Sequence, residues 1–163
     1  EVTVPKGFDY MMADRTVLRP ISVFGAMGVK RVSGKPFADP SIPVFFYAPA
    51  GAQGPKFLMT NNYRVLKGYN FADSYALSVA HLADRLKGAG EFVADWPRET
   101  KFPDLQQRKA IQAALVRLGF LKGSSDGRLG PVTSAAYAKY QASRGEVADG
   151  FITLQAYDEL TAN

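Results

Sequence analysis

The chain has 163 residues, of which 47% are hydrophobic, and a formal net charge of +5 at pH 7. This size accommodates one ordinary domain or two small ones with a packed core. Cysteine is absent and His81 is the one histidine, which excludes disulfide frameworks, thiolate zinc sites and cysteine nucleophiles, and we predict no metal and no cofactor. The 20 basic and 15 acidic residues form no run of like charge, which disfavours a nucleic-acid-binding protein.

The N-terminus carries no targeting signal that the sequence reveals. No apolar stretch has the length of a membrane span, and the basic, apolar and small-residue pattern of a signal peptide is missing. The sequence opens on Glu1, inside the expected strand EVTVP, and not on a methionine. We interpret the chain as a processed or truncated piece of a longer polypeptide.

Residues 2–66 are rich in glycine, proline and β-forming residues, which predicts short strands joined by tight turns. The expected strands are VTVP, VKRV, PVFFYAPA, KFLMT and YRVL. A short helix is expected from Pro20 to Met27, closed by Gly28. This part is therefore predicted to form a small antiparallel sheet.

A longer helix is expected from Ala72 to Lys87, with Gly88 as its stop. Its apolar stripe, which we expect to be buried, consists of Tyr75, Val79, Leu82 and Leu86. The YRVL strand is expected to lead through Tyr69 and Asn70 into this helix. Such a junction suits a carbohydrate site, because a phenol ring can lie against a pyranose face while an amide hydrogen-bonds its hydroxyl groups.

Residues 90–103 contain prolines and charged residues and show neither the helical nor the strand periodicity of apolar residues, which predicts a linker. Asp104 and Gln107 then form a capping-box pattern at the start of a helix. The apolar stripe of this helix consists of Ile111, Leu115 and Leu118, and Gly119 is its expected end.

Two further helices are expected, and each follows an Asp-Gly turn. They run from Pro131 to about Ser143 and from Leu154 to Leu160. The turns are Asp126-Gly127, followed by Thr133, and Asp149-Gly150, followed by Thr153. We interpret this internal echo as turn-and-cap chemistry, in which the threonine opens the next helix, and not as a binding signature.

These elements together predict an α+β fold, with a small antiparallel sheet and a long helix followed by a three-helix module. We place the domain boundaries at residues 1–95, a linker at 96–104 and the helical module at 105–163.

The helical module has the motif order IQ-x-x-L and a glycine, DG-x-x-G-x-x-T-x-x-A, a YQ pair, and ADG-x-x-T. In this order it resembles the three-helix peptidoglycan-binding module. The resemblance implies binding to the glycan strands and stem peptides of peptidoglycan. Arg128 and Arg144 are candidate partners for peptide carboxylates through bidentate hydrogen bonds, although each can also be a solvated surface arginine.

Residues 1–95 contain VPKGFDYMMADRTVLRPISVFGAMGVKR, AGAQGPKFLMTNNYRVLKGYN and, in the next helix, HLADR. In this order they resemble the C-terminal third of the B-type membrane-bound lytic murein transglycosylases, whose domain is lysozyme-like. The resemblance implies that Tyr69, Asn70 and Tyr75 line a glycan cleft. From the residues alone, Tyr75 would be a core residue and Asn70 would shape the helix entry.

The catalytic group of that family has no counterpart in this sequence. Lytic transglycosylases use one glutamate as acid and then as base, and it lies on an earlier helix in a Glu-Ser or Glu-Thr context. The glutamates of this chain lie in other settings: Glu1, Glu91, Glu99, Glu146 and Glu159. We therefore assign no catalytic residue and expect this chain alone to be inactive.

Three functions are compatible with these features. The preferred one is the C-terminal fragment of a lytic murein transglycosylase in the periplasm or envelope of a Gram-negative bacterium, with the missing N-terminal catalytic part or other cell-wall proteins as further partners. The alternative is a non-catalytic anchor or scaffold that binds peptidoglycan. A helix-turn-helix DNA binder is disfavoured, because the middle helix offers only Lys139 and Arg144 for phosphate contacts.

Overall fold

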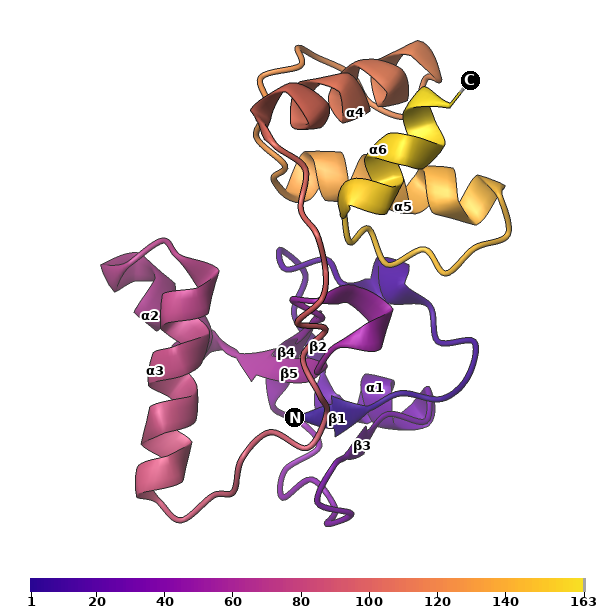
Figure 1. Ribbon diagram of the computed structural model, residues 1–163. Coiled ribbons are helices and arrows are strands. Elements are labelled where there is room, and N and C mark those ends of the chain that lie inside the picture. The colour runs from indigo at the N-terminus through magenta and orange to yellow at the C-terminus, as the bar shows by residue number, and fades with distance from the viewer. Residues whose placement is uncertain (163) are drawn as a thin grey trace. The chain divides into compact units, whose positions relative to one another are not determined.

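The computed structural model describes residues 1–162 and divides into two compact units (Figure 1). The first unit consists of residues 1–8, 13–48 and 55–95. The second consists of residues 9–12 and 49–54 together with the chain from Trp96 onward. Two short segments of the N-terminal half are therefore part of the helical second unit.

The first unit contains two small antiparallel sheets. One has the strand order β2 (Arg19–Pro20), β4 (Pro43–Tyr47) and β5 (Phe57–Thr60). The other pairs β1 (Val2–Thr3) with β3 (Lys30–Arg31). The predicted short helix is α1 (Ile21–Ala26), and Gly28 follows it at φ 85°, a conformation that favours glycine. The predicted α+β class is confirmed.

Aromatic side chains of β4 form the core of the first unit. Phe45 and Phe46 are 2% and 0% exposed. The ring of Phe46 lies 6.4 Å from that of Phe24 in α1, whereas the ring of Phe45 lies 5.9 Å from that of Tyr63. Because consecutive strand residues point to opposite faces, both faces of β4 are covered.

The predicted YRVL strand is wrong, since these residues lie inside α2 (Asn61–Tyr69), which begins directly after β5. A strand would place Tyr63 and Val65 on the same face, yet Tyr63 is 4% and Val65 68% exposed. Helical geometry instead puts Tyr63 and Lys67 on one face, four residues apart. Tertiary contacts of Tyr63 override the β-propensity of this short segment.

The predicted apolar stripe of the long helix, α3 (Asp73–Leu86), is also wrong. The residues that α3 buries are Ala76 and Leu77, which are 0% and 8% exposed. Leu82 and Leu86 of the expected stripe are 59% and 81% exposed. The predicted helix is confirmed, but the side of α3 that packs within this unit is the one that contains Ala76 and Leu77.

The second unit is built on α4 (Leu105–Arg117), α5 (Pro131–Ser143) and α6 (Leu154–Thr161). The predicted capping box is present, with Gln107 N–H donating to Asp104 at 2.9 Å and Asp104 N–H donating to Gln107 at 2.8 Å. Its core contains Ile111, Leu115, Tyr137, Ala156 and Leu160. Leu118, predicted to be in the core, is instead 46% exposed at the helix end.

The two Asp-Gly turns are fastened to the helices by glutamines. The side-chain oxygen of Gln112 accepts from Gly127 N–H at 2.6 Å, and its amide group donates to Asp126 at 3.0 Å. The predicted role of Thr133 as a helix opener is wrong. It is the third residue of α5 and buried, with its hydroxyl 3.3 Å from the amide nitrogen of Gln112. Its side chain therefore completes the turn and does not cap the helix.

Gln141 repeats this arrangement at the second turn. Its oxygen accepts from Gly150 N–H at 2.8 Å, and its amide group donates to Asp149 at 3.2 Å. Thr153 occupies the N-cap position of α6, but its side chain makes no capping hydrogen bond. The internal echo is thus a pair of glutamine-fastened turns.

Candidate functional site

Exposed aromatic rings gather where α2 meets α3. The ring centroids of Tyr69, the last residue of α2, and Tyr75, in the first turn of α3, lie 6.1 Å apart at an interplanar angle of 27°. Tyr69 is 84% exposed, Tyr75 38%, and Phe71 in the connection 86%. We call these three residues the aromatic step. Rings exposed in this way can pack against the apolar face of a sugar.

Asn70 shapes the connection between the two helices. Its backbone N–H donates to the carbonyl of Leu66 at 3.1 Å, and its side-chain oxygen accepts from Ala72 N–H at 2.9 Å. This is a local Asx turn, and it leaves the side-chain NH₂ group as the part of Asn70 suited to donate to a ligand. The structure therefore places Tyr69, Asn70 and Tyr75 together, at a helix-to-helix junction instead of the expected strand-to-helix junction.

Asp73, the first residue of α3, is the centre of an ionic cluster beside the aromatic step. One oxygen of its carboxylate accepts from Arg15 Nη1 at 2.9 Å, Lys67 Nζ at 2.9 Å and Tyr63 Oη at 3.1 Å. The ammonium group of Lys67 also donates to the carbonyl of Phe71. Asp73 thus joins the start of α3 to α2 and to the segment that contains Arg15.

The protonation states follow from these contacts. Burial by itself would raise the pKa of Asp73, but the hydrogen bonds from Arg15 and Lys67 outweigh it, and the pKa lies below its ordinary value. Burial raises the pKa of Tyr63, and neighbouring Tyr47 and Asp73 raise it further. At neutral pH one carboxylate therefore faces two cations and a neutral phenol, which leaves the cluster with a net positive charge.

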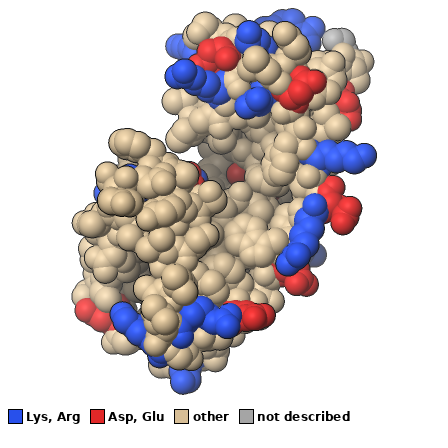
Figure 2. Space-filling view, turned by 60° about the vertical axis from the view of Figure 1, so that its left-hand side comes forward, with Lys and Arg blue, Asp and Glu red and all other residues tan. Residues whose placement is uncertain are grey.

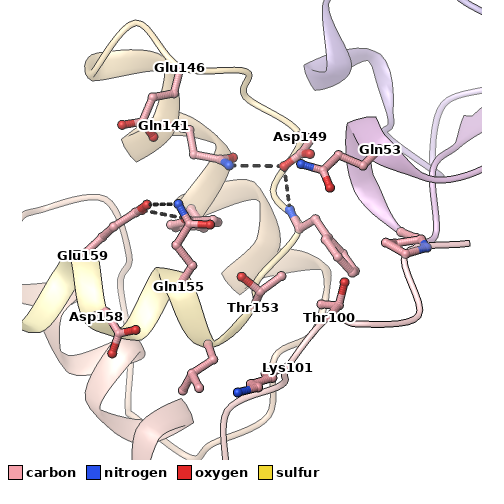
Figure 3. Close-up of a pocket in the computed structure, with 15 residues that line it drawn as sticks. Gln53, Thr100, Lys101, Gln141, Glu146, Asp149, Thr153, Gln155, Asp158 and Glu159 are labelled. Atoms are coloured by element: carbon pink, nitrogen blue, oxygen red, sulfur yellow. Dashed lines mark hydrogen bonds between the residues drawn. The ribbon is translucent and has the colours of Figure 1, made fainter.

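The second unit contains a pocket of about 520 Å³ (Figure 3). Its lining comes from α5, α6, the turn between them, the segment before α4, and Ala50 and Gln53. The carboxylates that line it are Glu146, Asp149, Asp158 and Glu159. Lys101 is the one lysine or arginine among its described lining residues.

Two carboxylates of the pocket are held by hydrogen bonds. Tyr137 donates to Glu159 at 3.2 Å, and Gln155 donates to the other oxygen of Glu159 at 2.7 Å. Burial raises the pKa of Tyr137, and the Glu159 carboxylate raises it further, so the phenol remains a neutral donor. Asp149 accepts from Ala52 N–H at 2.8 Å, which fastens residues 49–54 to the helical unit. Carboxylates arranged in this way can accept hydrogen bonds from ammonium and amide groups.

The two predicted arginines lie outside this pocket. Arg144 forms an ion pair with Glu146 at 3.0 Å, and its guanidinium lies 5.8 Å from the ring centre of Tyr140. Arg128 follows the first Asp-Gly turn and is exposed. Its backbone N–H donates to the Asp126 carboxylate at 2.8 Å. Exposed lysines and arginines are interspersed with acidic residues on the face shown in Figure 2, without a broad area of one sign.

Within residues 1–162, the one histidine of the sequence lies against an aromatic ring. The imidazole of His81 stacks on Phe92 with ring centroids 3.8 Å apart, as a structural histidine would. No group of three or more His, Asp and Glu side chains in this range is arranged to hold a metal ion. No helix in the same range is long and apolar enough to cross a membrane.

Sequence reasoning missed the Asp73 cluster, the exposure of Phe71 and the pocket. The sequence does not reveal the role of Asp73, because its partners Arg15 and Tyr63 are 58 and 10 positions away along the chain. The Lys67 and Asp73 pair joins two helices, so helical spacing rules do not reveal it. Phe71 offered a signal, since a large aromatic residue in a three-residue connection has little core to enter.

Comparison with known proteins identifies the class of protein. Residues 1–84 match the family model "Transglycosylase SLT domain", and the chain belongs to this family. Residues 104–160 match the model "Putative peptidoglycan binding domain". The search of curated proteins found no match.

Solved structures of one protein resemble this chain over nearly its whole length. SltB3 from Pseudomonas aeruginosa in complex with NAG-anhNAM-pentapeptide matches with a TM-score of 0.90 and 37% identity, and SltB3 in complex with NAG-NAM-pentapeptide with 0.91 and 36%. Each match covers 98% of this chain and 43% of the SltB3 chain. This chain therefore spans less than half the length of SltB3.

Proposed function

We propose that this chain is the C-terminal part of a lytic murein transglycosylase, in which residues 1–95 contribute one wall of the glycan cleft and residues 105–163 bind peptidoglycan, with 96–104 as the linker. The exposed stack of Tyr69 and Tyr75 is the observation that carries the proposal. The likeness to SltB3, which was solved with muropeptides, supports it.

In this proposal Tyr69 supplies a ring face to a sugar, and the NH₂ group of Asn70 donates to a sugar hydroxyl or carbonyl. The Tyr75 ring extends the face and its hydroxyl serves as a further donor. The positive charge of Arg15 and Lys67 beside the step favours the muramyl side of a glycan, whose stem peptide carries carboxylates, over a neutral sugar alone.

The catalytic glutamate lies outside this chain in our proposal. Glu1 accepts from the backbone N–H groups of Val93 and Ala94 at 2.7 and 2.8 Å, so its carboxylate is used to fasten the chain. Glu91 and Glu146 pair with arginines, and Glu159 is bonded to Tyr137 and Gln155. Each of these carboxylates has hydrogen-bonding or ionic partners, and we assign none of them to the protonation of a glycosidic oxygen.

In the second unit, the pocket and the two arginines are the proposed contacts to the stem peptide. The carboxylates of the pocket suit the amino groups of a peptide, and Arg128 and Arg144 suit its carboxylates. We place the protein in the cell envelope, in the periplasm of a Gram-negative bacterium.

A sedimentation assay with purified sacculi tests the proposal. The chain should co-sediment with the wall, and no anhydromuropeptide should be released above the buffer control. Failure to co-sediment contradicts wall binding, whereas release of anhydromuropeptides contradicts the location of the catalytic glutamate. A longer protein that includes the upstream part of the gene product distinguishes the proposal from the non-catalytic anchor. The longer protein should have lytic activity if the proposal is correct and none if the protein is an anchor.

A further inference from the structure

One carboxylate oxygen holds together the segments that carry the aromatic step. Oδ1 of Asp73 receives donors from Arg15, from Tyr63 and from Lys67, at 2.9, 3.1 and 2.9 Å. The phenol of Tyr63 also lies 3.2 Å from the backbone carbonyl of Asp73. The first turn of α3 is therefore bound to α2 through both the side chain and the main chain of a single residue.

The distance between the two stacked rings depends on how α2 and α3 meet. Tyr69 ends α2, and Tyr75 lies two residues after Asp73 in α3. The connection between the helices is three residues long, and the Lys67 ammonium that binds Asp73 also binds its Phe71 carbonyl. The rings cannot set this geometry themselves, because Tyr69 is 84% exposed and has little protein surface to pack against.

We infer that Asp73 is a positioning residue for the proposed glycan site, whose carboxylate holds Tyr69 and Tyr75 in the stacked arrangement that a sugar face requires. The inference rests on the proposed function for its ligand. It assigns Asp73 no contact with sugar and no proton transfer. Arg15, Tyr63 and Lys67 act through Asp73, so the site depends on four side chains outside the aromatic step.

The test compares Asp73→Asn with Asp84→Asn in the whole chain. Both variants exchange one carboxylate of α3 for an amide, and Asp84 is an exposed residue near the other end of the helix. The first measurement is the set of NMR ring-to-ring NOEs between Tyr69 and Tyr75. The second is the affinity for NAG-NAM-pentapeptide. Asp73→Asn should lose the ring contacts and bind roughly tenfold more weakly, which corresponds to about one charged hydrogen bond.

Asp84→Asn should leave the NOEs and the affinity within about twofold of the wild-type values. Tyr63→Phe removes one donor without changing charge, and it should weaken both readouts partially. If Asp73→Asn fails to fold, the NOEs and the affinity of Tyr63→Phe test the positioning role. A merely structural role would lower the melting temperature while the NOEs and affinity, measured well below it, stay at the wild-type level.

The outcomes separate the inference from the function on which it rests. Ring contacts that persist in Asp73→Asn or are unchanged in Tyr63→Phe overturn the positioning role alone. Tyr69→Ala that binds NAG-NAM-pentapeptide as tightly as the wild type overturns the proposed glycan site. Loss of both contacts and affinity in Asp73→Asn, with Asp84→Asn unaffected, supports the inference.

Discussion

The side-chain oxygen of Gln141 accepts a hydrogen bond from Gly150 N–H at 2.8 Å, and this contact closes the second Asp-Gly turn. Gln141 is 9% exposed, so its loss leaves buried polar groups of the turn without their partner. Replacing Gln141 by leucine should destabilise the helical unit by about 1–3 kcal/mol in denaturant unfolding. Gln106→Leu, at an exposed position of α4, is the control and should change stability by less than about 0.5 kcal/mol.

A comparison of Gly150 with Gly119 separates the effect of close packing from the effect of backbone conformation. Both have positive φ, 66° and 80°, so alanine is strained at either position. A Cβ at Gly150 would lie 2.5 Å from the carbonyl oxygen of Ser134, whereas at Gly119 it would meet nothing within 4 Å. We expect Gly150→Ala to lower the free energy of unfolding by about 1–3 kcal/mol more than Gly119→Ala. Equal melting temperatures for the two variants would contradict this packing.

The core of the helical unit should depend on Leu115 and not on Leu118. Leu115 is 0% and Leu118 46% exposed, although both belong to the predicted stripe. Leu115→Ala should cost about 2–5 kcal/mol in chemical denaturation. Leu118→Ala should cost less than about 1 kcal/mol, since most of its side chain remains in water. A larger loss for Leu118→Ala than for Leu115→Ala would show that the core is assigned wrongly.

The ionic cluster should make the first unit sensitive to acid. The pKa of Asp73 is below its ordinary value, so the carboxylate stabilises the fold above the unfolded-state pKa of about 3.9, and this contribution is lost as the pH falls through the folded-state pKa. Wild type should therefore lose more stability between about pH 5 and pH 2 than Asp73→Asn. Parallel stability-against-pH curves for the two proteins would contradict the depressed pKa.

The sequence predicts the helical unit well because the signals that begin and end its helices are local. The capping box at Asp104 and the proline at the start of α5 each act within one helical turn. The errors in the first unit concern the secondary structure of the YRVL segment and the buried face of α3. Val65 and Leu82 are apolar, as core residues usually are, yet both are exposed. Which face of a helix packs depends on residues far away in the sequence, and a single sequence does not reveal these contacts.

The site shows the same division. The resemblance to transglycosylases predicts a site at Tyr69, Asn70 and Tyr75, and in the structure these residues lie close together at the α2–α3 connection. The Asx turn of Asn70 could be anticipated, because asparagine commonly bonds a backbone N–H two residues on. The ion pair between Arg15 and Asp73 could not be anticipated, because it depends on how the segment before α1 packs against α3.

The most direct measurement is an NMR titration of the whole chain with NAG-NAM-pentapeptide, read at Tyr69, Asn70 and Tyr75. Saturable shifts at these residues are expected. Asn70→Ala, which also removes the hydrogen bond from Ala72 N–H, should weaken binding by at least about 0.5–1.5 kcal/mol, the net value of one hydrogen bond. Shifts confined to the second unit, or an Asn70→Ala variant with wild-type affinity, would contradict the account.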